Sequence, residues 1–188
     1  MLTLDPIWTP LPQQRIYRAL LRAFAYPGEV VALAGHTGAE PAWVGVLAAL
    51  LDATTPLHDH ARWLDERLWR MLGVRSVGLA EAAFVLADGG RAPDADFAPP
   101  TGTLLTPEHG ATLILTVATL GSGPLNLVLR GPGVDGTRRL AVAGLDHAWL
   151  TRRAEWNSDF PLGVDLILAD REQVAAIPRT AIIHIDEG

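Results

Sequence analysis

NSDFPLGVDLILADREQVAAIPRT, residues 157–180, is the stretch of this chain that decides its fold. Phe160, Pro161 and Gly163 predict a tight turn, because proline and glycine suit the backbone angles that turns require. The apolar run over residues 164–169 predicts a buried strand. Asp170 is placed to cap a short helix that would follow. We therefore expect a turn, an interior strand and a short helix before the Pro-Arg-Thr exit.

Two charged residues stand among apolar neighbours in this stretch: Asp165 inside the predicted strand and Arg179 near the exit. A charge taken out of water is costly unless it finds an opposite charge or a hydrogen-bonding partner. We expect first that Asp165 and Arg179 form an ion pair that fastens the C-terminal segments to a sheet. The second possibility is that either residue contacts a ligand.

The remaining chain alternates between helical and strand patterns. Apolar residues at three- and four-residue spacing predict helices over residues 13–25, 41–51, 59–72 and 145–156. Strands are predicted over residues 30–34, 83–87, 112–118, 125–130, 138–142 and 181–185. The three strands between residues 112 and 142 are expected to form an antiparallel meander. The whole pattern predicts a single three-layer α/β domain over residues 1–188, with a central mixed sheet.

Composition narrows the possible functions. The chain has 188 residues, a formal net charge of -6, no cysteine, and 15 basic residues that are all arginine. Without cysteine it cannot hold a cysteine-ligated iron–sulfur cluster or supply a thiol nucleophile. Without lysine it cannot form a Schiff base with pyridoxal phosphate or supply the lysine of a phosphate-binding P-loop. Its acidic balance argues against nucleic acid as a partner.

Neither a leader nor a membrane segment is expected. The first ten residues, MLTLDPIWTP, lack the basic and apolar regions of a signal peptide. No apolar run reaches the roughly 18 residues that a membrane span needs. These patterns predict a cytoplasmic protein with no membrane partner.

Two motifs invite a ligand and are better explained otherwise. His58-Asp59-His60 has the side chains of a zinc or iron site, but it stands before a predicted helix and no third ligand position is evident. Gly121-Ser122-Gly123-Pro124 is rich enough in glycine for a phosphate loop. It lies between two predicted strands, whereas a phosphate loop leads into a helix, so a hairpin turn is expected. We therefore expect no metal and no cofactor.

Landmarks spread along most of the chain resemble, in their order, those of the PhnH family, a subunit of the bacterial carbon–phosphorus lyase system. They are Tyr17-Arg18 leading to Phe24–Gly28, Leu50–Asp52 followed by Thr55-Pro56, Gly110–Leu113, Leu129–Val134, and the stretch 157–180. Two positions depart from the pattern. Thr55 stands where an acidic residue is expected, and Ala181 where a second threonine is expected.

This resemblance implies a fold similar to the large domain of pyridoxal-phosphate-dependent transferases, without that cofactor. It implies assembly with partner subunits PhnG, PhnI and PhnJ, and a homodimer when isolated. The system is a transferase and lyase assembly that displaces adenine from ATP with a phosphonate, and this subunit is required for that step. The resemblance implies an accessory role without catalysis by this chain alone. Asn157, Asp165 and Arg179 are then candidates for ligand or interface contacts, and no catalytic residue is assigned.

Two alternatives remain open. The chain could be a small-molecule enzyme in its own right, with Asp165 as acid or base and Arg179 holding an anionic substrate. It could also be a purely structural oligomer, in which Arg179 supports assembly or stability only.

Overall fold

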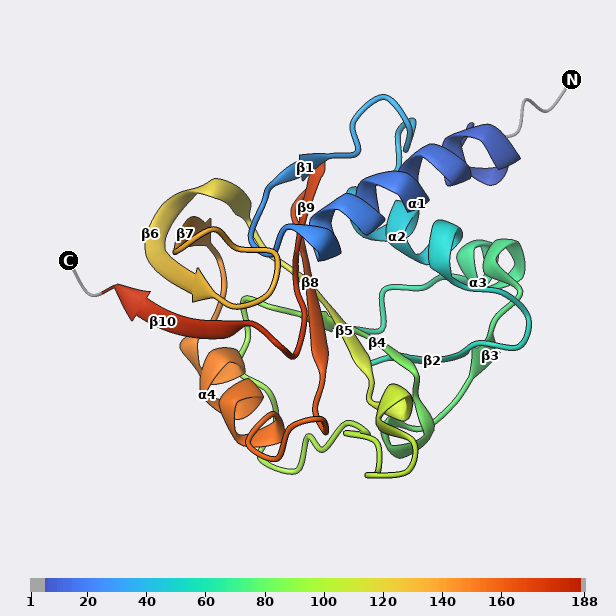
Figure 1. The fold of residues 1–188 in the computed structure, drawn as a ribbon. Helices are drawn as coiled ribbons and strands as arrows, with labels where there is room; N and C mark the ends of the chain where they lie inside the picture. Colours follow the sequence, from blue (N-terminus) through green and yellow to red (C-terminus); the bar gives the residue numbers. More distant parts are fainter. Residues whose placement is uncertain (1–5, 187–188) are drawn as a thin grey trace, which may run out of the picture.

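The fold of residues 6–186 is described by a computed structural model and is built on a seven-stranded sheet (Figure 1). In spatial order its strands are β1 (Val31–Ala32), β9 (Gln173–Ile177), β8 (Asp165–Ala169), β5 (Thr112–Thr116), β4 (Phe84–Asp88), β2 (Pro56–Asp59) and β3 (Arg75–Ser76). The five strands from β8 to β3 are parallel, whereas β9 pairs antiparallel with both β8 and β1. The sheet is therefore mixed, as predicted.

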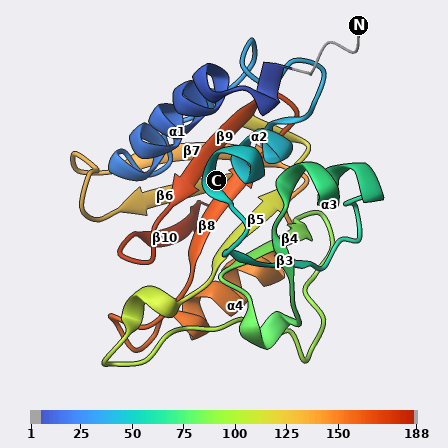
Figure 2. The same cartoon turned by 90° about the vertical axis from the view of Figure 1, so that its right-hand side faces the viewer.

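Each face of the sheet packs against its own hydrophobic cluster. Ile114 of β5 and Ile167 of β8 point into the cluster covered by α1 (Pro10–Ala25), α2 (Ala42–Leu50) and α3 (Glu66–Leu72). Leu113 and Leu166 point to the opposite cluster, which contains residues of α4 (His147–Trp156). Figure 2 shows α1 and α2 on the far side of the sheet from α4. The chain is an α/β protein of three layers, because both faces of a largely parallel sheet must be covered.

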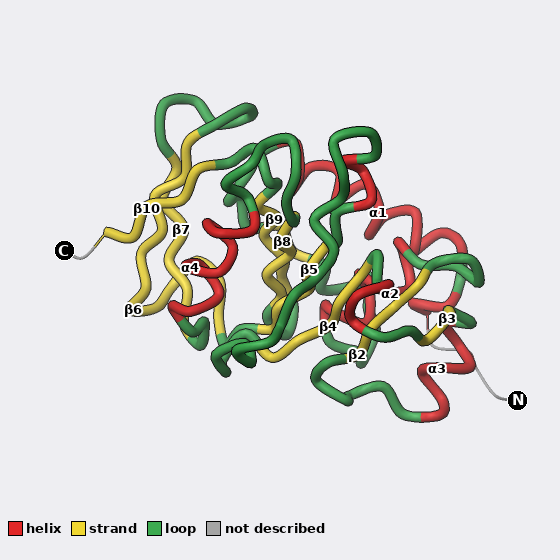
Figure 3. Tube along the Cα trace, turned by 90° about the horizontal axis from the view of Figure 1, so that it is seen from below, coloured by secondary structure: helices red, strands yellow, loops and turns green. Residues whose placement is uncertain are grey.

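A second sheet of three antiparallel strands lies on the α4 side (Figure 3). Its spatial order is β10 (Ile182–Asp186), β6 (Thr119–Arg130) and β7 (Arg138–Ala143). The predicted meander was therefore wrong in one strand, because β5 belongs to the central sheet. Residues 113–115 of β5 are all buried, which requires cover on both faces, whereas residues 125–129 of β6 alternate between buried and half-buried.

The predicted hairpin turn at Gly121–Pro124 is also wrong, because these residues lie inside β6. The pairing register shifts there, and Leu120 and Leu125 are both opposite Val142 of β7. Gly123 has φ +141, and a Cβ on it would lie 2.3 Å from the carbonyl carbon of Val142. Glycine at this position makes an irregular bulge possible where the sequence suggested a chain reversal.

Two predicted helices are shorter or absent. The helix expected over 59–72 is α3, which begins at Glu66 after Asp65 accepts a hydrogen bond from the Leu68 N–H. Residues 56–59 form strand β2 instead. The short helix expected after Asp170 is strand β9, and Asp170 accepts bonds from the Glu172 and Gln173 N–H groups in the turn. Residues 174–177 are all buried, and this requires cover on both sides, which a strand within the sheet receives.

Residues 1–5, half of the segment on which the prediction of no leader rests, lie outside the described residues. Within 6–186, none of the helices combines the length and the apolar character needed to cross a bilayer.

Candidate functional site

Asp165 and Arg179 form the ion pair predicted from the sequence. Nη2 of Arg179 lies 2.7 Å from Oδ2 of Asp165, and Nε lies 3.2 Å from the same oxygen. The backbone N–H of Arg179 donates to Oδ1 at 2.6 Å. The two side chains are only 19% and 14% exposed. Asp165 therefore holds both the guanidinium and the backbone of the segment between β9 and β10.

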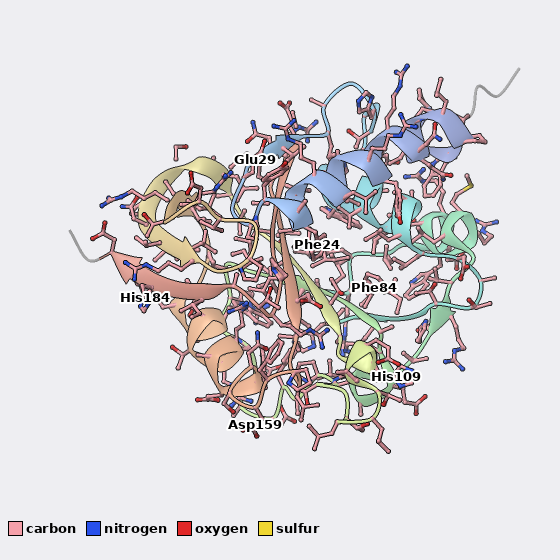
Figure 4. All side chains as sticks on the ribbon, viewed as in Figure 1. Phe24, Glu29, Phe84, His109, Asp159 and His184 are labelled. Atoms are coloured by element: carbon pink, nitrogen blue, oxygen red, sulfur yellow. The ribbon has the colours of Figure 1, made fainter. Side chains whose placement is uncertain are left out.

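Arg179 also fixes a segment about 70 residues earlier in the chain. Its Nη1 donates to the carbonyl oxygen of Pro107 at 2.7 Å, and Nη2 lies 3.4 Å from that of Gly110. All three side-chain nitrogens are thus engaged. We call this arrangement of Asp165, Arg179, Pro107 and Gly110 the arginine clasp; in Figure 4 His109 marks the loop that it holds.

Gly110 leaves room for the clasp. A Cβ at this position would lie 2.1 Å from the carbonyl oxygen of Gly163 and 2.6 Å from Nη1 of Arg179. Both distances are shorter than any van der Waals contact, so a side chain cannot fit without moving the clasp.

Asn157, the third candidate from the sequence, holds the turn before β8. Its Nδ2 donates to the Val164 carbonyl at 3.1 Å, and its Oδ1 accepts from the Val164 N–H at 2.8 Å. Gly163 has φ +137, and a Cβ there would lie 2.4 Å from Oδ1 of Asn157. Asn157 therefore sets the start of β8, and Asp165 is the first residue of that strand.

Asn157→Ala should lower the free energy of unfolding by about 2 kcal/mol, because both hydrogen bonds disappear and the buried Val164 keeps an unpaired N–H. Urea unfolding measures the loss. Ser158→Ala is the matched control, since Ser158 is exposed and its hydroxyl makes no hydrogen bond to residues 6–186. Equal stability of the two variants would contradict this role for Asn157.

Arg153 is a buried cation that the sequence analysis missed. It is 4% exposed, and its Nη2 donates to the carbonyls of Pro178 and Ala181 at 2.7 and 3.1 Å. Burial lowers the pKa of Arg153 to about 10, while the negative charge of Asp165 opposes that shift. The residue therefore stays charged at neutral pH. Its spacing of four from the buried Trp149 was the signal that placed it on the inner face of α4.

A groove of about 440 Å³ separates α4 from β10, the strand that carries His184 in Figure 4. Asn157, Arg153 and Arg179 line it together with apolar residues of both elements, but Asp165 does not. The structure thus brings two of the three candidates to one surface. Their polar atoms are engaged with the backbone, so the groove offers mainly apolar contact.

A second cavity, of about 510 Å³, lies at the carboxyl ends of β2 and β4. We call it the carboxyl-end crevice. Its lining is rich in charged and aromatic side chains, namely His58, Asp59, His60, Arg62, Trp63, Asp88, Arg91, Asp94 and Trp149. The sequence analysis singled out only the first three, because it assigned residues 56–59 to the approach to a helix. Assigning β2 correctly would have placed His58 and Asp88 at neighbouring strand ends.

The crevice is not arranged as a metal centre. Among residues 6–186, no three His, Asp or Glu side chains are grouped so that they could bind one ion. His58 and His60 lie on one side of the strand, with ring centroids 5.7 Å apart. Oδ2 of Asp59 accepts a bond from the Leu64 N–H, and His60 lies 3.4 Å from Asp94. The site therefore combines separate donors and acceptors.

Comparison with known proteins agrees with the order of the sequence landmarks. The family model "Bacterial phosphonate metabolism protein (PhnH)" matches residues 7–184. A Stutzerimonas stutzeri protein named putative C-P lyase subunit HtxG is 46% identical over 179 residues, covering 95% of this chain and 89% of the relative. A Rhizobium meliloti protein, named alpha-D-ribose 1-methylphosphonate 5-triphosphate synthase subunit PhnH, is 30% identical over 188 aligned positions, covering 94% and 90%. The chain therefore belongs to the PhnH family of bacterial phosphonate metabolism proteins.

Proposed function

We propose that this chain is an accessory subunit of a carbon–phosphorus lyase system. In that role it is required for forming alpha-D-ribose 1-methylphosphonate 5-triphosphate from ATP and a phosphonate. The observation that carries the proposal is the family match over residues 7–184, together with two relatives that are both named as subunits. The implied partners are PhnG, PhnI and PhnJ, in the cytoplasm, with a homodimer as the isolated form.

The chemistry of the arginine clasp supports an accessory role over a stand-alone enzyme. An enzyme that used Asp165 and Arg179 on an anionic substrate would need both groups free to meet it. In the structure, both oxygens of Asp165 accept bonds, and Arg179 donates to Asp165, Pro107 and Gly110. The clasp instead orders the backbone beside the groove.

The surface around the groove supports assembly with other chains. β10 is an edge strand of the smaller sheet, so one side of its backbone is unpaired in that sheet. Ile182 and Ile185 on β10 are 58% and 37% exposed. Exposed apolar residues on a free strand edge favour covering by another chain. A purely structural oligomer would use the same features, and the activity measurement below separates it from a required subunit.

The likeness to the large domain of pyridoxal-phosphate-dependent transferases remains part of this proposal. The parallel strands from β8 to β3, covered by helices, support it. The chain has no lysine for a Schiff base.

Co-expression with PhnG, PhnI and PhnJ tests the proposed function. This chain should co-elute with them, and the assembly should release adenine from ATP in the presence of methylphosphonate. The same partner set expressed without this chain is the control and should not carry out the reaction. Adenine release by the isolated chain would support the stand-alone enzyme. Full activity of the partners alone would leave only a structural role.

A further inference from the structure

The carboxyl-end crevice lies where the direction of the chain connections reverses. From β2 the chain passes through α3 to β3, and α3 packs on the face of α1 and α2. From β4 it passes to β5 on the other side, and Phe97 of that connection packs on the α4 face. Diverging connections leave a gap at the ends of neighbouring parallel strands, the usual position of ligand sites in open α/β sheets. Neither groove residues nor the clasp contribute to it.

The crevice holds two arginines whose charge is not used by the fold. Neither Arg62 nor Arg91 makes a side-chain hydrogen bond or ion pair to any residue between 6 and 186. Arg179 and Arg153, in contrast, are spent on backbone carbonyls. Arg62 also has φ +57, a left-handed conformation that is uncommon for a residue with a side chain.

Acceptors lie in the same cavity. Nδ1 of His58 is 3.0 Å from the Val77 carbonyl oxygen, so that nitrogen carries the proton and Nε2 of the neutral ring can accept a bond. Asp88 uses Oδ1 for the Gly90 N–H, and Oδ2 has no partner within 6–186. Oδ1 of Asp59 is buried and likewise unpaired among the described residues. This side of the crevice is therefore rich in acceptors that lack donors.

The mixture of charges selects the class of ligand. A simple anion would meet the carboxylates of Asp59 and Asp88, and a simple cation would meet Arg62 and Arg91. A ligand with hydroxyl groups at one end and an anionic group at the other satisfies both sets. Trp63, 39% exposed and steadied by Trp43 at 6.1 Å between ring centroids, offers an apolar face for a sugar ring. The volume lies in the usual range for small-molecule sites.

We propose that the carboxyl-end crevice binds a phosphorylated pentose, with its hydroxyls donating to Asp88 and His58 and its phosphate held by Arg62 and Arg91. The choice of pentose rests on the proposed function, because the name of the Rhizobium meliloti relative specifies a ribose phosphate ester. The donor and acceptor pattern itself comes from this chain alone. A zwitterionic aminophosphonate has a compatible charge pattern but too few hydroxyl donors for the acceptors.

Calorimetric titration of the full chain with ribose 5-phosphate tests this site. Separate titrations use ribose, inorganic phosphate and 2-aminoethylphosphonate. Ribose 5-phosphate should bind to one site per chain, about tenfold or more tighter than each of the others, because it alone can engage both sets of groups. No saturable binding overturns the proposal. So does equal or tighter binding of phosphate, ribose or the aminophosphonate.

Two variants locate the site, and a third is the control. Arg62→Gly suits the left-handed backbone and removes the cation, so it should weaken binding about tenfold or more while the chain stays folded. Asp88→Asn keeps the acceptor for Gly90 but loses the charge. It should weaken ribose 5-phosphate and strengthen inorganic phosphate, because it removes a strong acceptor and a repulsion together. Arg75→Ala, at an exposed arginine on β3 outside the crevice, should leave affinity within about twofold.

The outcomes separate this proposal from the function on which it rests. Loss of affinity in Arg75→Ala but not in Arg62→Gly would overturn the crevice, as would tighter ribose 5-phosphate binding by Asp88→Asn. Co-elution with the synthase partners but no sugar phosphate binding would overturn the crevice and leave the accessory role. Sugar phosphate binding with no co-elution would do the reverse.

Discussion

Asp165→Ala should lower the free energy of unfolding by about 3 kcal/mol, the lower part of the range for breaking a buried ion pair. The change leaves the Arg179 guanidinium, 14% exposed, without its carboxylate, and the Arg179 backbone N–H without an acceptor. It also removes the negative charge that supports the protonated form of buried Arg153. Urea denaturation followed by far-ultraviolet circular dichroism measures the loss.

Two further variants give that measurement its meaning. Asp165→Asn keeps an acceptor for the Arg179 N–H but not the charge, so it should cost less, about 1–2 kcal/mol. Asp159→Ala removes an exposed acid from the same stretch and should change stability by less than about 0.5 kcal/mol. If Asp165→Ala were as stable as Asp159→Ala, the clasp would not hold the fold, and a ligand role for Asp165 would regain ground.

Gly110→Ala should be almost as damaging, at about 3 kcal/mol, because the added methyl group has no space. Its Cβ would stand 2.1 Å from the Gly163 carbonyl oxygen and 2.6 Å from Nη1 of Arg179. Relief requires moving backbone or opening the clasp, and neither is cheap in a packed interior. The same urea titration reports the effect.

Gly78→Ala is a closely matched control. Gly78 has φ -67 and ψ 161, and Gly110 has φ -65 and ψ 136, so alanine fits either backbone. A Cβ on Gly78 meets nothing within 4 Å. Gly78→Ala should therefore be neutral or stabilise by about 0.5 kcal/mol, since it restricts the unfolded chain. Similar losses in both variants would show that backbone freedom, and not the space beside Arg179, is what Gly110 supplies.

The sequence predicted those parts of the molecule whose pattern is local. The stripe that includes Ile16 and Leu20 identified α1, and both residues are buried in it. The apolar run around Asp165 identified an interior strand, and the isolated charges Asp165 and Arg179 identified each other. In these cases the chemistry of a few neighbouring residues is enough to require one arrangement.

Other parts depended on neighbours that sequence spacing does not reveal. His58 and Asp59 are polar, yet they lie in a strand because β3 and β4 pair on both sides of β2. Val174 to Ile177 are buried in a strand that β8 and β1 complete. The crevice was missed for the same reason, since Arg62, Asp88 and Arg91 meet only after β2 and β4 are paired.

The arginine clasp also bears on how a newly made chain can fold. The residue that fixes the loop at Pro107 and Gly110 is Arg179, which is synthesised about 70 residues later. The outer edge of the central sheet has the same property, because β1 pairs only with β9. Contacts so distant along the chain form late, since the intervening segment must first be brought into place. Translation must therefore be nearly finished before this domain can close, and until then the central strands need protection from unwanted association.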